Sequence, residues 1–96
     1  MNEQEFLKFL NAIVNKVTNY SATDIQLKSM SDDFESAGLD SLEMILVNMH
    51  ICDALKIPGN IDDSIQATTA KELYDFLLKA QVVMPETAED ALSVLA

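Results

Sequence analysis

The chain contains few residues that could bind a metal or act as a nucleophile, with one cysteine, Cys52, and one histidine, His50, among 96 residues. A single cysteine cannot form a disulfide within the chain, and one cysteine with one histidine is too small a set for a metal site. Because they are two residues apart in a long apolar stretch, the two side chains point to different faces of a helix. We therefore expect no metal, a packed or half-exposed Cys52, and a His50 without a catalytic role.

Basic residues are also scarce, with 6 Lys and Arg against 16 Asp and Glu, which gives a formal net charge of −10. Nucleic acids and anionic membrane surfaces repel such a chain, so neither is an expected partner. A protein partner with a basic patch is favoured, chiefly because opposite charges speed the encounter. The alternative is that the acidity only keeps a small domain soluble.

Long hydrophobic runs are missing as well. No apolar segment reaches transmembrane length, and residues 1–5 contain neither a basic region nor the apolar core of a signal peptide. We expect a cytoplasmic protein without stable membrane insertion, which agrees with the absence of paired cysteines.

Glycine and proline occur only twice each and tryptophan is absent, whereas 49% of the residues are hydrophobic. Few helix breakers and no alternating strand pattern predict one small all-α domain. Apolar residues at helical spacing predict helices over 3–19, 41–56 and 69–81, the last with Thr69 as its N-cap.

The remaining segments carry weaker patterns. A single helical turn is expected at 61–65, and a short helix after Pro85 in the tail. Residues 20–40 read as a long connection without an element of its own, and such connections often carry function. Its scattered apolar residues are expected to attach it to the core: Ile25, Leu27, Met30, Phe34 and Leu39.

One serine, Ser41, lies where a polar, glycine-containing stretch gives way to the longest apolar stretch, in the run Gly38-Leu39-Asp40-Ser41-Leu42-Glu43. At a helix start its hydroxyl stays reachable from solvent, and an anionic group attached there meets unpaired backbone N–H groups and the positive end of the helix dipole. The position therefore suits a phosphate ester. Asp40 and Glu43 also form a capping-box pattern, which starts ordinary helices.

This run resembles the G-x-D-S-L attachment motif of the acyl carrier protein family. The small size, the acidity and the position of Ser41, after one amphipathic helix and a long loop, are also similar to that family. So is the segment Ala67 to Leu77, in which a threonine caps a helix ending in Asp-aromatic-aliphatic. The resemblance covers about residues 3–80.

The resemblance implies a four-helix bundle, with three main helices and one short one, and a covalent 4′-phosphopantetheine on Ser41, flanked by Asp40 and Leu42. A phosphopantetheinyl transferase would attach this arm from coenzyme A, and the arm would carry acyl intermediates as thioesters to acyl-transferring, condensing and modifying enzymes of fatty-acid or polyketide-like synthesis. We expect a monomer, with a carrier domain at 1–81 and an extension at 82–96.

The resemblance also assigns partner recognition to the helix that begins at Ser41. That helix is less acidic than in the best-known fatty-acid carriers, so we expect a more apolar partner face. The expected residues of this face are Leu42, Glu43, Met44, Leu46 and Met49.

Two other functions stay open. One is a peptidyl or aminoacyl carrier, including a D-alanyl carrier, although Asp40 before Ser41 favours acyl cargo. The other is an unmodified acidic helical interaction module in which Ser41 serves only as a cap. We expect no enzymatic activity, because no nucleophile–base pair or metal set can be assembled from this composition.

Overall fold

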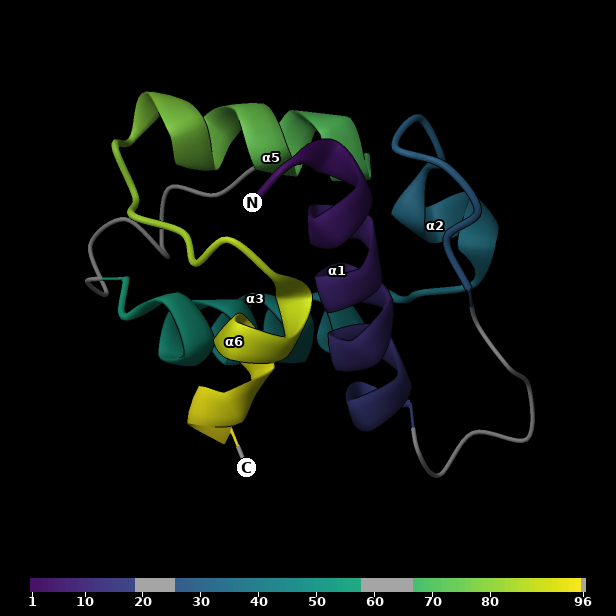
Figure 1. Ribbon diagram of the computed structural model, residues 1–96. Helices are drawn as coiled ribbons and strands as arrows, with labels where there is room; N and C mark the ends of the chain where they lie inside the picture. Colours follow the sequence, from purple (N-terminus) through teal and green to yellow (C-terminus); the bar gives the residue numbers. More distant parts are fainter. Residues whose placement is uncertain (19–25, 58–66, 96) are drawn as a thin grey trace.

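The computed structural model of the chain describes residues 1–18, 26–57 and 67–95, and within these ranges it contains helices and no strands (Figure 1). The first helix, α1, spans Glu3–Val17 and begins at Asn2, whose side-chain oxygen accepts a hydrogen bond from the Glu5 N–H at 2.8 Å. Helical spacing places its apolar residues on one buried face: Phe6, Phe9, Leu10, Ile13 and Val14. The prediction of an amphipathic first helix is confirmed.

Two further long helices pack on α1. Helix α3 spans Ser41–Leu55 and α5 spans Ala70–Lys79, with Thr69 accepting a hydrogen bond from the Glu72 N–H as predicted. In Figure 1 α1 passes from α5 at the top to α3 below. The Phe6 ring, which is fully buried, lies 5.0 Å from the ring of Tyr74 on α5, centre to centre. The all-α bundle is confirmed.

The tail folds back onto this bundle. Helix α6, Ala88–Leu92, is followed by one turn of 3-10 helix, η1, at Ser93–Leu95. It packs against α1 and α3, with Ala88 and Ala91 buried in the same core (Figure 1). Glu5 on α1 accepts a hydrogen bond from the Ala88 N–H at 3.1 Å. The predicted short helix after Pro85 is therefore present and is built into the core.

The prediction of a long connection without an element was wrong in part. A four-residue helix, α2, spans Phe34–Ala37; Asp33 caps its start, and Gly38 ends it in the left-handed conformation at φ 110°. The expected attachment of this connection to the core is confirmed by three buried side chains, Leu27, Phe34 and Leu39. Ile25 and the predicted turn at 61–65 lie outside the described residues.

Backbone hydrogen bonds join this connection to the start of α5. The Phe34 N–H donates to the Thr68 carbonyl at 2.9 Å, and the Lys71 N–H donates to the Met30 carbonyl at 2.8 Å. Nearer α1, the Asn11 side-chain amide both donates to and accepts from the backbone of Leu27. These contacts hold α2 in place beside the start of α3.

Candidate functional site at the start of helix α3

Ser41 is the first residue of α3, and Asp40, not Ser41, caps the helix. Asp40 Oδ1 accepts a hydrogen bond from the Glu43 N–H at 2.8 Å, and Glu43 Oε1 accepts one from the Asp40 N–H at 3.0 Å. The Ser41 side chain is exposed, and no described residue forms a hydrogen bond with its hydroxyl. The reading of Ser41 as the cap is therefore wrong, and its hydroxyl is available for chemistry.

The start of α3 also retains unpaired backbone donors. The capping box uses the N–H of Glu43, and the Met44 N–H donates to the Asp40 carbonyl at 3.0 Å. Within the described residues, the N–H groups of Ser41 and Leu42 have no such partner. A phosphodiester on Ser41 would sit beside these donors at the positive end of a 15-residue helix. The local geometry thus fits the anionic group that the sequence predicts.

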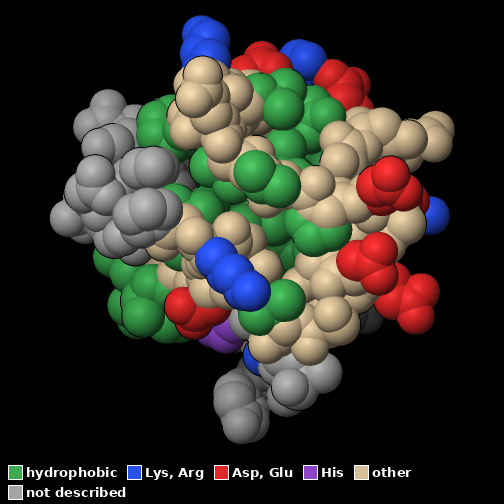
Figure 2. All heavy atoms as spheres, turned by 60° about the vertical axis from the view of Figure 1, so that its left-hand side comes forward, with side chains coloured by type: hydrophobic (Ala, Val, Ile, Leu, Met, Phe, Trp, Pro, Cys, Tyr) green, Lys and Arg blue, Asp and Glu red, His purple; other side chains and the backbone are tan. Residues whose placement is uncertain are grey.

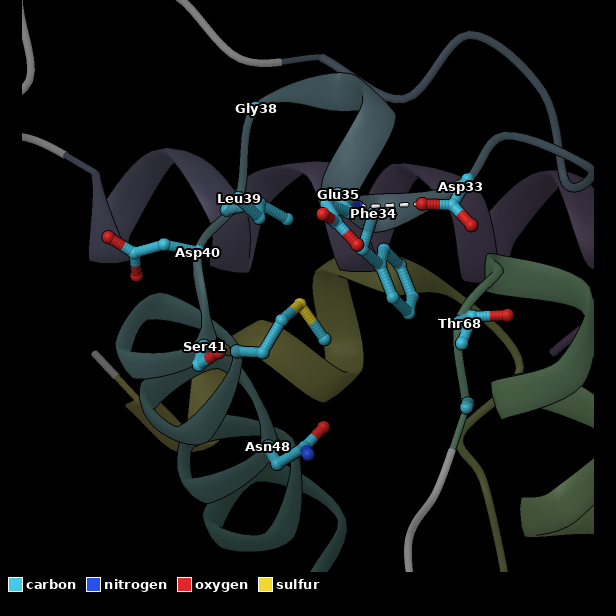
Figure 3. Close-up of a pocket in the computed structure, with 11 residues that line it drawn as sticks. Asp33, Phe34, Glu35, Gly38, Leu39, Asp40, Ser41, Asn48 and Thr68 are labelled. Carbon is cyan, nitrogen blue, oxygen red and sulfur yellow. Dashed lines mark hydrogen bonds between the residues drawn. The ribbon is translucent and has the colours of Figure 1, made fainter.

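A pocket of about 640 Å³ opens beside Ser41 (Figure 3). It lies between α2 with its flanking residues, the first two turns of α3, and the segment that precedes α5. Figure 3 shows Phe34 and Thr68 across the pocket from Ser41. The lining residues are Asp33, Phe34, Glu35, Gly38, Leu39, Asp40, Ser41, Met44, Asn48, Ala67 and Thr68. The pocket therefore combines apolar walls with several polar groups.

Asn48 contributes an unusual polar group to this pocket. Its side-chain oxygen Oδ1 has less than 1 Å² of accessible surface and no hydrogen-bond partner among the residues that the structure describes. In Figure 3 this oxygen points to the side of the pocket where Phe34 lies. A buried acceptor without a partner costs about 1–3 kcal/mol, so such groups are rare in folded proteins. Sequence reasoning did not identify Asn48 as a pocket residue.

A second face of α3 carries an exposed hydrophobic stripe, formed by Leu42, Ile45, Leu46 and Met49. Their exposed fractions are 65%, 56%, 36% and 48%, and their spacing of three and four residues aligns them along one side of the helix. Ile45 was not among the residues predicted for this face. Met44 was predicted there, but it is half-buried and lines the pocket. Glu43 serves in the capping box.

Hydrophobic exposure is not confined to α3. The face of the molecule in Figure 2 shows hydrophobic side chains over much of its surface, with most of the visible acidic side chains toward its upper and right-hand edges. Val83, in the segment between α5 and α6, is 87% exposed. No helix within the described ranges is long and apolar enough to cross a membrane.

Cys52 and His50 lie further along α3, away from Ser41. Cys52 is 8% exposed and belongs to the hydrophobic core, which is the first of the two states, packed or half-exposed, that the sequence left open. The His50 ring nitrogen Nδ1 lies 2.7 Å from the Leu46 carbonyl oxygen one turn earlier, to which an Nδ1–H donates. Neither residue lines the pocket at Ser41.

Comparison with known proteins agrees with this geometry. The model of a family described as "Phosphopantetheine attachment site" matches residues 8–77 of the chain, a range that contains Ser41 and the pocket. Domains of this family are sites of covalent 4′-phosphopantetheine attachment, and they interact with a phosphopantetheinyl transferase and with biosynthetic enzymes. Neither a curated protein nor a solved structure matches the chain. The match covers more than half of the chain, and the chain therefore belongs to the phosphopantetheine-attachment family of carrier domains.

Proposed function

We propose that the protein carries acyl intermediates as thioesters on a 4′-phosphopantetheine arm attached to Ser41. The observation that supports this most is the state of the Ser41 hydroxyl, which is exposed, has no hydrogen bond among the described residues and lies at the first residue of a long helix. The residues of this chain would position the phosphodiester through the start of α3. The thiol at the end of the arm would supply the reactive group, so the protein itself needs no catalytic residue.

Under this proposal the protein serves fatty-acid or polyketide-like synthesis. Its partners would be acyl-transferring, condensing and modifying enzymes. The exposed stripe on α3 begins at Leu42, next to Ser41. An enzyme that receives the arm must approach Ser41, so this stripe would be among the first surfaces it meets. Apolar side chains at the centre of an interface contribute more to affinity than charges at its rim.

Cargo loading tests the proposal. Purified protein is incubated with a broad-specificity phosphopantetheinyl transferase and either coenzyme A, an acyl-coenzyme A or an aminoacyl-coenzyme A, and the products are then offered to acyl-transferring and aminoacyl-transferring enzymes. The proposal predicts that acyl-transferring enzymes accept the acyl form, and that neutral hydroxylamine releases the acyl group as it does from a thioester. Preferential acceptance of the aminoacyl form would contradict the acyl assignment.

A further inference from the structure

The unpaired Asn48 oxygen and the Ser41 hydroxyl belong to one pocket. Seven residues separate them along α3, which corresponds to about two helical turns and roughly 10 Å along the axis. Seven residues also bring a helix back to nearly the same face, so both side chains point to the same side of α3. A chain attached to Ser41 that lies back along the pocket would run directly toward Asn48.

The chemistry of the arm supplies the hydrogen-bond donor that Asn48 lacks. In 4′-phosphopantetheine the first amide N–H is seven covalent bonds from the serine oxygen, a reach of roughly 9 Å. The bonds between them include a dimethyl-substituted carbon, which matches the apolar walls formed by Phe34, Leu39 and Met44. The next carbon bears a hydroxyl, a second donor that lies one bond closer to Ser41 and therefore falls further short of Asn48. The spacing of apolar and polar groups along the arm therefore follows that of the pocket.

We propose that Asn48 Oδ1 accepts a hydrogen bond from the first amide N–H of the arm and so holds the arm in this pocket. The inference rests on the proposed attachment at Ser41. Met44 lies one helical turn before Asn48, half-buried in the same pocket. Because Asn48 Oδ1 has less than 1 Å² of accessible surface in this structure, the contact requires a rotation of the Asn48 side chain or a small movement of the flexible Met44 beside it. Asn48 acts here as a positioning residue and takes no part in bond making.

Asn48 Oδ1 requires a hydrogen-bond donor that is tethered to Ser41. Such a donor could belong to the arm or to the cargo at the end of the arm. The arm is favoured because its amide lies at the required distance from Ser41, whereas cargo is attached beyond the end of the arm. Cargo would reach Asn48 only if the arm folded back past the pocket. The experiment below separates the two sources by comparing three forms: without the arm, with the arm alone, and with arm and cargo.

Nuclear magnetic resonance on isotope-labelled protein tests the contact without any substitution. Addition of the arm should shift the side-chain amide signals of Asn48. The signals of Asn11 on α1, whose side-chain amide is hydrogen-bonded to the backbone of Leu27, serve as the internal control and should not move. Unchanged Asn48 signals in protein whose mass shows a bound arm would overturn the inference while leaving the proposed function intact.

A substitution series gives an independent readout. Asn48→Leu removes the unpaired acceptor, so the arm-free variant should melt at a temperature about 5 °C higher than arm-free wild type. The arm should raise the melting temperature of wild type by several degrees more than that of Asn48→Leu. Asn15→Leu, the same change at an exposed position of α1, should keep the wild-type gain.

The remaining outcomes also decide between the alternatives. If the arm raised the melting temperatures of wild type and Asn48→Leu equally, the inference would be overturned. If the rise in melting temperature depended on Asn48 only in protein whose cargo carries a hydroxyl or amide, that result would place the donor in the cargo and overturn its assignment to the arm. Failure of the transferase to load folded wild-type protein would instead count against the proposed function itself.

Discussion

Asp40 and Glu43 exchange hydrogen bonds across the first turn of α3, with Glu43 N–H to Asp40 Oδ1 at 2.8 Å and Asp40 N–H to Glu43 Oε1 at 3.0 Å. This pair fixes the start of the helix without any contribution from the side chain of Ser41, which lies between them. The structural task of beginning α3 and the proposed chemical task of carrying the arm are thus assigned to different residues.

Substitutions at these two positions should therefore separate the tasks. Asp40→Ala removes the cap and should lower the free energy of unfolding by about 1 kcal/mol. Ser41→Ala changes an exposed side chain without a hydrogen bond, so its effect should stay within about 0.5 kcal/mol. Urea unfolding of both variants measures this, and a loss of about 1 kcal/mol in Ser41→Ala would show that the serine has a structural role.

The exposed stripe on α3 should matter for partner enzymes and not for folding. Ile45→Glu combined with Met49→Glu places charge in the middle of the stripe, and we expect kcat/KM with the transferase or a condensing enzyme to fall about tenfold. The melting temperature should hardly change, because both side chains are about half exposed in the wild type.

Val83→Glu is the matched control, since Val83 is exposed but lies between α5 and α6 and not on α3. It should leave the rates unchanged. Full activity of the Ile45 and Met49 double variant would show that partners approach Ser41 from another side.

The tail should contribute to stability through Ala91, which is fully buried on α6. Ala91→Asp buries a charge, and we expect it to lower the free energy of unfolding by about 2 kcal/mol or more. Val94→Asp introduces the same charged residue at a position of η1 that is half exposed, and its effect should stay within about 0.5 kcal/mol. Thermal or urea unfolding of both variants compares them, and equal small effects would mean that the tail does not pack in solution.

Docking of the tail should also depend on pH through Glu5. The hydrogen bond from the Ala88 N–H, with a smaller contribution from Lys8, lowers the pKa of the Glu5 carboxyl below its ordinary value of 4.5. Because the folded-state pKa is the lower one, this stabilisation is fully present above about pH 4.5 and is lost as the pH falls through the folded-state value.

Melting curves of wild type and Glu5→Gln between neutral pH and pH 3 test this dependence. The melting temperature of Glu5→Gln should fall less than that of wild type over the acidic part of the range, because one carboxylate no longer titrates. Glu86→Gln, an exposed position, serves as the control. If the melting temperatures of wild type and Glu5→Gln fell in parallel with pH, the ionised Glu5 carboxylate would not stabilise the docked tail.

Local sequence patterns predicted the helix starts well. The caps at Asp40 and Thr69 depend on side chains only three residues apart, so their signatures can be read directly in the sequence. The same kind of signal was present for α2, in Asp33 before the helix and Gly38 after it, but four residues are too few to show a hydrophobic period. That is why this helix was missed.

The two faces of α3 could not be predicted from the sequence in the same way. The helix is apolar on nearly all sides, so the exposure of Ile45 and the half-burial of Met44 depend on which sides α1, α6 and η1 cover. The buried oxygen of Asn48 is likewise a result of packing between elements distant in sequence. Ser41 could be identified because its role depends on a local motif and on its position at a helix start.

The central claim is that Ser41 carries the arm, and intact mass measurement followed by fragment analysis tests it most directly. Wild type, Ser41→Ala and the control Ser36→Ala, which alters an exposed serine of α2, are incubated with coenzyme A and a broad-specificity phosphopantetheinyl transferase. We predict that wild type and Ser36→Ala each gain the mass of one phosphopantetheine, located on Ser41, and that Ser41→Ala gains none. A gain that persists in Ser41→Ala, or no gain in folded wild-type protein that carried no arm at the start, would contradict the account.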